Sequence, residues 1–109
     1  MAKYRLRFFF DAGSGICLWA GNDAARERFD YAIEPSSLPV PENTWRRMIY
    51  LCSWYDTSID WNYPPDPSPW REEERARFEG EAHKLLALLR EQLGPDFEII
   101  DESRTSLDP

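Results

Sequence analysis

The sequence predicts one α+β domain over residues 1–109, with a small antiparallel sheet packed by two helices on one face. Three patterns lead to this expectation: alternating apolar residues near the N-terminus, two segments with apolar residues at helical spacing, and a short apolar run near the C-terminus. A chain of 109 residues has room for one hydrophobic core. It contains a single Val, so its strands must use Phe, Ile, Tyr and Trp, which argues for little sheet.

The N-terminal segment predicts a β-hairpin. Apolar residues alternate with basic ones from Tyr4 to Phe10, which is the period of a strand. Asp11–Gly15 (DAGSG) has the composition of a turn, and Ile16–Ala20 is a second apolar run. The Gly-Ser-Gly triplet in the turn lacks the glycine spacing and the following helix that a nucleophile elbow requires. Residues 22–29 contain helix formers, and whether they form a helix is left open.

A first long helix is expected after the proline-rich linker. Pro41 suits the first helical position, where its missing N–H costs nothing. Apolar residues then recur at intervals of three and four: Trp45, Met48, Ile49, Cys52, Tyr55 and Ile59. Tyr50, Leu51 and Trp54 widen this stripe, so the helix is either central to the core or presents a second face to a partner.

A second helix is predicted to begin at Ser68 as N-cap and Pro69 as first residue, and to end at Gly94 and Pro95. Three glutamates in its first turns suit the helix dipole. Its core stripe is expected to comprise Phe78, Ala82, Leu85, Leu86, Leu89 and Leu93. Phe97, Ile99 and Ile100 predict a last strand, and residues 103–109 a frayed tail.

The net charge of −7 argues against nucleic acid or an anionic membrane surface as a partner, since both are repelled at long range. Residues 48–70 carry three Asp and no basic residue, and residues 94–109 carry five acids against Arg104. The N-terminus has no apolar leader segment, so we expect a cytoplasmic protein. Cys17 and Cys52 are expected to be reduced, buried thiols.

The segment with the most unusual composition is residues 54–70 (WYDTSIDWNYPPDPSPW), which we call the aromatic loop. Prolines restrict its backbone and large rings supply contact area with few rotors, which favours a preorganised binding surface. The predicted partner-binding residues are Asp56, Asp60, Trp61, Tyr63, Asp66 and Trp70. The alternative is that the rings fold inward and cap the space between the helices, above all for Trp54 and Trp70.

No metal, cofactor or catalytic site is predicted. The alternating Asp and Asn of the loop begin like a calcium-binding EF-hand, but Trp61 and Pro67 replace the required Gly and Glu. Asp56 and Asp60 are better explained as a solvated acidic face than as a general acid–base pair. His83 lies beside the leucine stripe, and Cys17 lacks an activating basic neighbour in sequence.

Residues 45–102, with WYDTSIDWNYPPDPSPW, LGPDFEIID and the F-x(3)-A-x(2)-LL helix that joins them, resemble a group of uncharacterised small bacterial proteins. In size and acidity the chain also resembles the immunity proteins that neutralise secreted antibacterial toxins, including those of contact-dependent inhibition systems. This resemblance implies a cytoplasmic protein that binds a toxin domain and blocks its active site. It transfers no functional residue, because immunity families share almost no motif.

The first hypothesis is therefore a non-catalytic inhibitor that binds a basic toxin domain through the aromatic loop. The second is a small enzyme or ligand-binding domain, which requires a pocket where an acid converges with Cys17 or His83. The third is a homodimeric structural subunit that pairs through the wide apolar stripe of its first long helix.

Overall fold

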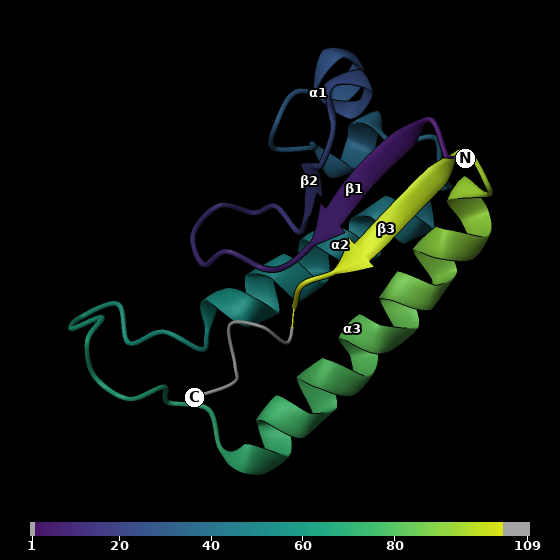
Figure 1. The fold of residues 1–109 in the computed structure, drawn as a ribbon. Coiled ribbons are helices and arrows are strands. Elements are labelled where there is room, and N and C mark those ends of the chain that lie inside the picture. Colours follow the sequence, from purple (N-terminus) through teal and green to yellow (C-terminus); the bar gives the residue numbers. More distant parts are fainter. Residues whose placement is uncertain (1, 104–109) are drawn as a thin grey trace.

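The sheet is built around β1 (Tyr4–Phe8), its central strand, in the computed structural model, which describes residues 2–103. β2 (Leu18–Ala20) pairs with one edge of β1 in antiparallel register, with Phe8 opposite Leu18. β3 (Phe97–Asp101) pairs with the other edge, with Leu6 opposite Ile99 (Figure 1). The α+β class and the N-terminal hairpin are thus confirmed.

The sheet is mixed, however, and the expectation of a fully antiparallel sheet is wrong: β3 runs parallel to β1. The helix before β3 returns the chain to the end of the sheet where β1 begins. The Tyr4 N–H donates to the carbonyl of Asp96 at 2.9 Å, just before β3 starts. The Arg90 guanidinium also donates to the Ile99 carbonyl at 2.7 Å. Both strands therefore start at the same end and run in the same direction.

Residues 22–29, left open by the sequence, contain the helix α1 (Asp23–Phe29). The Asn22 side chain caps it by accepting the Ala25 N–H at 3.0 Å, as an N-cap residue does. Ala25 and Phe29 are buried, and α1 packs against β1 and β2. A short 3₁₀ segment, η1 (Pro35–Ser37), leads to the next helix.

The first long helix, α2 (Glu42–Asp56), begins one residue after the expected position, with Pro41 as its N-cap. The Pro41 carbonyl accepts the N–H groups of Thr44 and Trp45. The buried face of α2 comprises Thr44, Met48, Leu51 and Cys52. Ile49 and Tyr50 are 43% and 66% exposed, so α2 contributes to the core with one face and presents apolar side chains on another.

The second long helix, α3 (Glu72–Leu93), starts later than predicted, with Arg71 and not Ser68 as N-cap. The Ser68 hydroxyl instead accepts the Trp70 N–H at 3.2 Å in a local turn. Arg71 has an extended backbone, so the helix can begin only after it. The predicted leucine stripe is buried in full, and the helix ends at Gly94, whose φ of 78° suits glycine.

The core lies between the inward face of the sheet, where Tyr4, Leu6 and Phe8 point, and the buried faces of the helices. Figure 1 shows α2 passing behind β1 and β3, with α3 alongside. The outward face of the sheet carries ion pairs of Arg5 with Glu98 and of Arg7 with Glu102. Most of the predicted tail, residues 104–109, lies outside the described residues.

Cys17 and Cys52 are both free and buried, as expected from the sequence. The pKa of the Cys17 thiol is raised well above its usual value, first by hydrogen bonding with Cys52 and second by burial. A thiol held protonated in this way is a weak nucleophile. His83 is exposed on α3, whereas Cys17 is fully buried.

Candidate functional site

The aromatic loop, residues 54–70, joins the end of α2 to the start of α3 and extends away from the sheet (Figure 1). Its first residues end α2 through tight turns. The Thr57 N–H and hydroxyl both bond to the Trp54 carbonyl, the hydroxyl at 2.6 Å. The Trp70 indole N–H donates to the Thr57 hydroxyl, also at 2.6 Å. The two ends of the loop are therefore tied to each other.

Trp70 belongs to an aromatic cluster beneath the loop. Its ring centroid lies 5.0 Å from that of Phe78, 6.1 Å from Trp54 and 6.2 Å from Tyr55. Phe10 joins the cluster by stacking on Tyr55 at 5.4 Å. Aromatic pairs at such separations stabilise a fold beyond the area they bury. The inward orientation considered for Trp54 and Trp70 is thus what the structure shows, and Trp70 anchors the loop.

Burial raises the pKa of the Tyr55 phenol in this cluster, and the nearby Asp11 carboxylate adds to the rise. The phenol stays neutral, so Tyr55 adds no negative charge to the loop.

Trp61 and Asp56 link the loop to the turn between β1 and β2. The Gly13 N–H donates to Asp56 Oδ1 at 2.8 Å, and the Trp61 indole N–H donates to the Asp56 carbonyl at 2.8 Å. A side chain at Gly13, where φ is 84°, would begin 3.4 Å from the Trp61 ring. Trp61 nevertheless keeps 57% of its surface exposed.

The middle of the loop is ordered by consecutive turns. Asp60 Oδ1 accepts the Asn62 N–H at 3.0 Å, and the Asp60 carbonyl accepts the Tyr63 N–H. The Asp66 N–H then donates to the Tyr63 carbonyl at 2.9 Å. Tyr63 is 59% exposed, and Asp66 is also exposed. These turns present the side chains from a defined backbone.

The six predicted residues therefore lie in three environments. Trp61, Tyr63 and Asp66 are exposed and available for contact. Asp56 and Asp60 are half-buried and use Oδ1 to hold backbone N–H groups of the loop and of Gly13. Trp70 packs inward.

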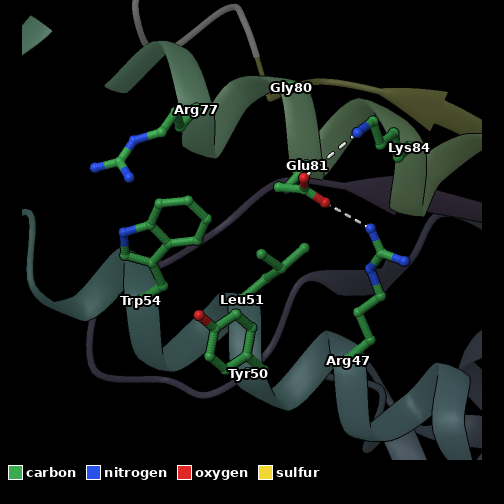
Figure 2. Close-up of a pocket in the computed structure, with 8 residues that line it drawn as sticks. All are labelled: Arg47, Tyr50, Leu51, Trp54, Arg77, Gly80, Glu81 and Lys84. Carbon is green, nitrogen blue, oxygen red and sulfur yellow. Dashed lines mark hydrogen bonds and ion pairs between the residues drawn. The ribbon is translucent and has the colours of Figure 1, made fainter. Parts of the chain in front are cut away.

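A second feature, which the sequence interpretation missed, is a groove of about 520 Å³ between α2 and α3. Figure 2 shows the side chains that line it; α2 supplies Arg47, Tyr50, Leu51 and Trp54, and α3 supplies Arg77, Gly80, Glu81 and Lys84. The spacing contains a signal for it, because Arg47, Tyr50 and Trp54 repeat at helical intervals along one side of α2, next to its buried residue Leu51. We call it the α2–α3 groove.

One ion pair crosses this groove, and a second lies along its α3 side. Glu81 accepts from Arg47 of α2 at 2.6 Å and lies 3.5 Å from Lys84 of its own helix. Trp54 donates its indole N–H to Glu74 at 3.0 Å.

Residues 2–103 contain no cluster of three or more His, Cys, Asp or Glu that could hold a metal ion. None of the helices described in that range is long and apolar enough to cross a membrane.

Comparison with known proteins places these features in one family. No curated protein matches the chain. The sequence profile of a family described as Serratia CdiI immunity protein-like matches residues 5–103, from β1 through the aromatic loop and both long helices to β3. A match over nearly the whole described chain shows the family, in agreement with the resemblance to contact-dependent inhibition immunity proteins. The chain therefore belongs to the Serratia CdiI immunity protein-like family.

Proposed function

We propose that this protein is a non-catalytic immunity protein that binds and neutralises a toxin domain, and that the exposed part of the aromatic loop contacts this domain. Membership of an immunity protein family implies a protein partner, a toxin. Inhibition by binding needs a stable contact surface and no reactive group, which agrees with the protonated, buried Cys17.

One observation carries the choice of surface: Trp61 and Tyr63 remain 57% and 59% exposed, although the backbone around them is held by hydrogen bonds. Exposed aromatic rings are frequent binding hot spots, and an ordered loop loses little further entropy on binding. Two exposed aromatic rings on an ordered backbone therefore favour this part of the loop as a contact surface.

The charge of the loop indicates the kind of partner. Residues 48–70 carry Asp56, Asp60 and Asp66 and no basic residue. A basic toxin domain would be attracted to this potential, which accelerates association at low ionic strength. We place the protein in the cytoplasm, because its free thiols suit a reducing compartment.

The test replaces Asp56, Asp60 and Asp66 by Asn together, which removes three charges and keeps Oδ1 as an acceptor for the Gly13 and Asn62 N–H groups. The partner tested is a toxin domain of a contact-dependent inhibition system, taken from the C-terminus of a large secreted protein if the neighbouring upstream gene encodes one, and association rates are measured against salt concentration. We expect association about tenfold slower at low salt, with a flatter salt dependence.

The matched control replaces Glu27, Glu34 and Glu91, which are exposed outside the loop, by Gln. It has the same net charge as the Asp variant, so it separates a local effect from a global one. Equal slowing in both variants, or unchanged rates in the Asp variant, would exclude the loop as the contact surface. No binding of that domain by the wild-type chain would contradict the neutralising function with this partner.

A homodimer through α2 is a second candidate, favoured by the exposure of Ile49 and Tyr50 on that helix. Light scattering over a concentration series distinguishes the two: a mass that stays at 12.9 kDa excludes this candidate, whereas a mass that doubles supports it.

A further inference from the structure

The α2–α3 groove differs from the rest of the chain in its charge. Arg47, Arg77 and Lys84 line it with Glu81 as the one acid, in a protein whose net charge is −7. Glu81 pairs with both Arg47 and Lys84, so its single negative charge is shared between two cations. The groove thus has an excess of positive charge.

Arg77 carries this excess most directly. It is exposed and forms no ion pair with any other residue in the range 2–103. In Figure 2 its guanidinium lies on the Trp54 side of the groove, apart from the Glu81 pairs. A guanidinium without a carboxylate partner can form a bidentate contact with one from another molecule.

The same groove contains apolar surface and free space. Tyr50 is 66% exposed, and its ring centroid lies 6.3 Å from that of Trp54, with Leu51 buried behind them. Gly80 contributes no side chain, and a Cβ built there meets no atom within 4 Å. The groove can therefore accept an apolar group next to a charged one.

The net charge of the protein indicates which kind of anionic group can bind in the groove. The aromatic loop continues from the end of α2, and its carboxylates and the net charge of −7 repel a polyanion such as nucleic acid at long range. A single carboxylate on a protein surface does not have this disadvantage, because the protein around it can be basic.

From this arrangement we propose that the α2–α3 groove receives an Asp or Glu side chain, flanked by an apolar residue, from the surface of the toxin domain. The proposal rests on the proposed function, since it assigns chemistry to the same partner. Trp54 lines the groove two residues before Asp56, so the positively charged groove and the acidic loop begin next to each other along the chain. A partner must then match both signs at once, which sets its orientation and rejects uniformly basic surfaces.

The first experiment compares Arg77→Glu with Arg46→Glu in binding to the toxin domain used to test the proposed function. Both residues are exposed, and both substitutions change the net charge equally, but Arg46 pairs with Glu42 and does not line the groove. We expect Arg77→Glu to raise Kd about tenfold or more and Arg46→Glu to change it less than about twofold. Equal effects of the two substitutions would overturn the proposal.

A charge swap identifies the partner residue. Each surface Asp and Glu of the toxin domain is replaced by Lys and tested against the Arg77→Glu variant. Recovery of most of the lost affinity by one such replacement, and not by the others, supports a direct pair. If none restores binding, Arg77 has no carboxylate partner and the proposal fails.

A further experiment fills the groove without changing any charge. Gly80→Phe places a ring in the open space, and Gly80→Ala is its control on the same helix position. We expect the Phe variant, confirmed as folded by circular dichroism, to raise Kd about tenfold or more and the Ala variant to bind like wild type. Wild-type affinity of a folded Phe variant would contradict occupation of the groove.

A last arm needs no toxin. Amide chemical shifts are followed by NMR during titration with the blocked dipeptide acetyl-Glu-Leu-amide, with acetyl-Lys-Leu-amide as control and a short oligothymidylate as the competing polyanion. Shifts around Tyr50, Arg77 and Gly80 with the acidic peptide alone support the proposal. Shifts with the oligothymidylate alone, or with no probe, contradict it. Because this arm is independent of toxin binding, it separates failure of the groove proposal from failure of the proposed function.

Discussion

The backbone N–H of Gly13 donates a 2.8 Å hydrogen bond to the Asp56 carboxylate, across 43 residues of sequence. It joins the turn between β1 and β2 to Asp56, which is the last residue of α2 and the third residue of the aromatic loop. The Trp61 indole donates to the carbonyl of the same Asp56. Asp56 thus holds the loop in place through these two hydrogen bonds, and its negative charge is part of the surface that we propose for toxin binding.

Two replacements of Asp56 distinguish the contribution of its hydrogen bond to Gly13 from that of its negative charge. Asp56→Ala removes the acceptor for the Gly13 N–H and should lower the free energy of unfolding by about 1 kcal/mol, the usual net value of one hydrogen bond. Asp56→Asn keeps an acceptor oxygen and should cost less than about 0.5 kcal/mol. Urea unfolding measures both, and equal losses would show that the oxygen does not hold the turn.

The two tryptophans of the loop should differ in what they contribute. Trp70→Ala removes a ring that contacts Trp54, Tyr55 and Phe78, and should destabilise the fold by about 2–3 kcal/mol. Trp61→Ala removes an exposed ring and one hydrogen bond, and should cost about 1 kcal/mol. Under the proposed function, Trp61→Ala should instead accelerate toxin dissociation. Thermal unfolding together with dissociation rates checks this, and the opposite ranking of stabilities would contradict the assignment.

Gly80 is a position where the protein should gain stability. It lies inside α3, its φ is not positive, and a Cβ there meets open space. Gly80→Ala should raise the free energy of unfolding by about 0.5–1 kcal/mol, because glycine loses more backbone entropy in a helix than alanine does. Calorimetry should show a melting temperature higher by a few degrees, and a lower one would mean that the groove cannot accept a methyl group.

The pair of Arg7 and Glu102 should make stability depend on pH in the acid range. Arg7 donates to both carboxylate oxygens of Glu102, at 2.9 and 2.7 Å, and this hydrogen bonding lowers the pKa of the Glu102 carboxyl below its ordinary 4.5. Because the pKa of Glu102 is lower in the folded state, its ionised carboxylate stabilises the fold. This stabilisation is fully present above the ordinary pKa and is lost as the pH falls through the lowered pKa.

Both side chains are partly exposed, so solvent screens the pair, and Glu102→Gln should cost less than about 1 kcal/mol at pH 7. The stability difference between wild type and Glu102→Gln should shrink as the pH falls below 4.5. A difference that stays constant down to pH 2 would show that the pair contributes nothing through its charge. Glu98→Gln, in the more exposed pair with Arg5, is the matched control.

The sequence by itself determined the elements whose signal is local. Alternation from Tyr4 predicted β1, and the leucine stripe with Gly94 predicted the face and the end of α3, because each pattern is set by the geometry of its own element. The same holds for the unusual composition of the aromatic loop, which needs no neighbours to be recognised.

Only the tertiary structure decided what depends on distant contacts. Strand direction followed from where α3 ends beside Tyr4, which no periodicity encodes. Trp70 and Trp61 are both tryptophans of the same loop. Trp70 packs inward against Phe78, whereas Trp61 remains exposed. The α2–α3 groove exists because two helices lie side by side, so residues about thirty positions apart share a site that neither helix forms alone.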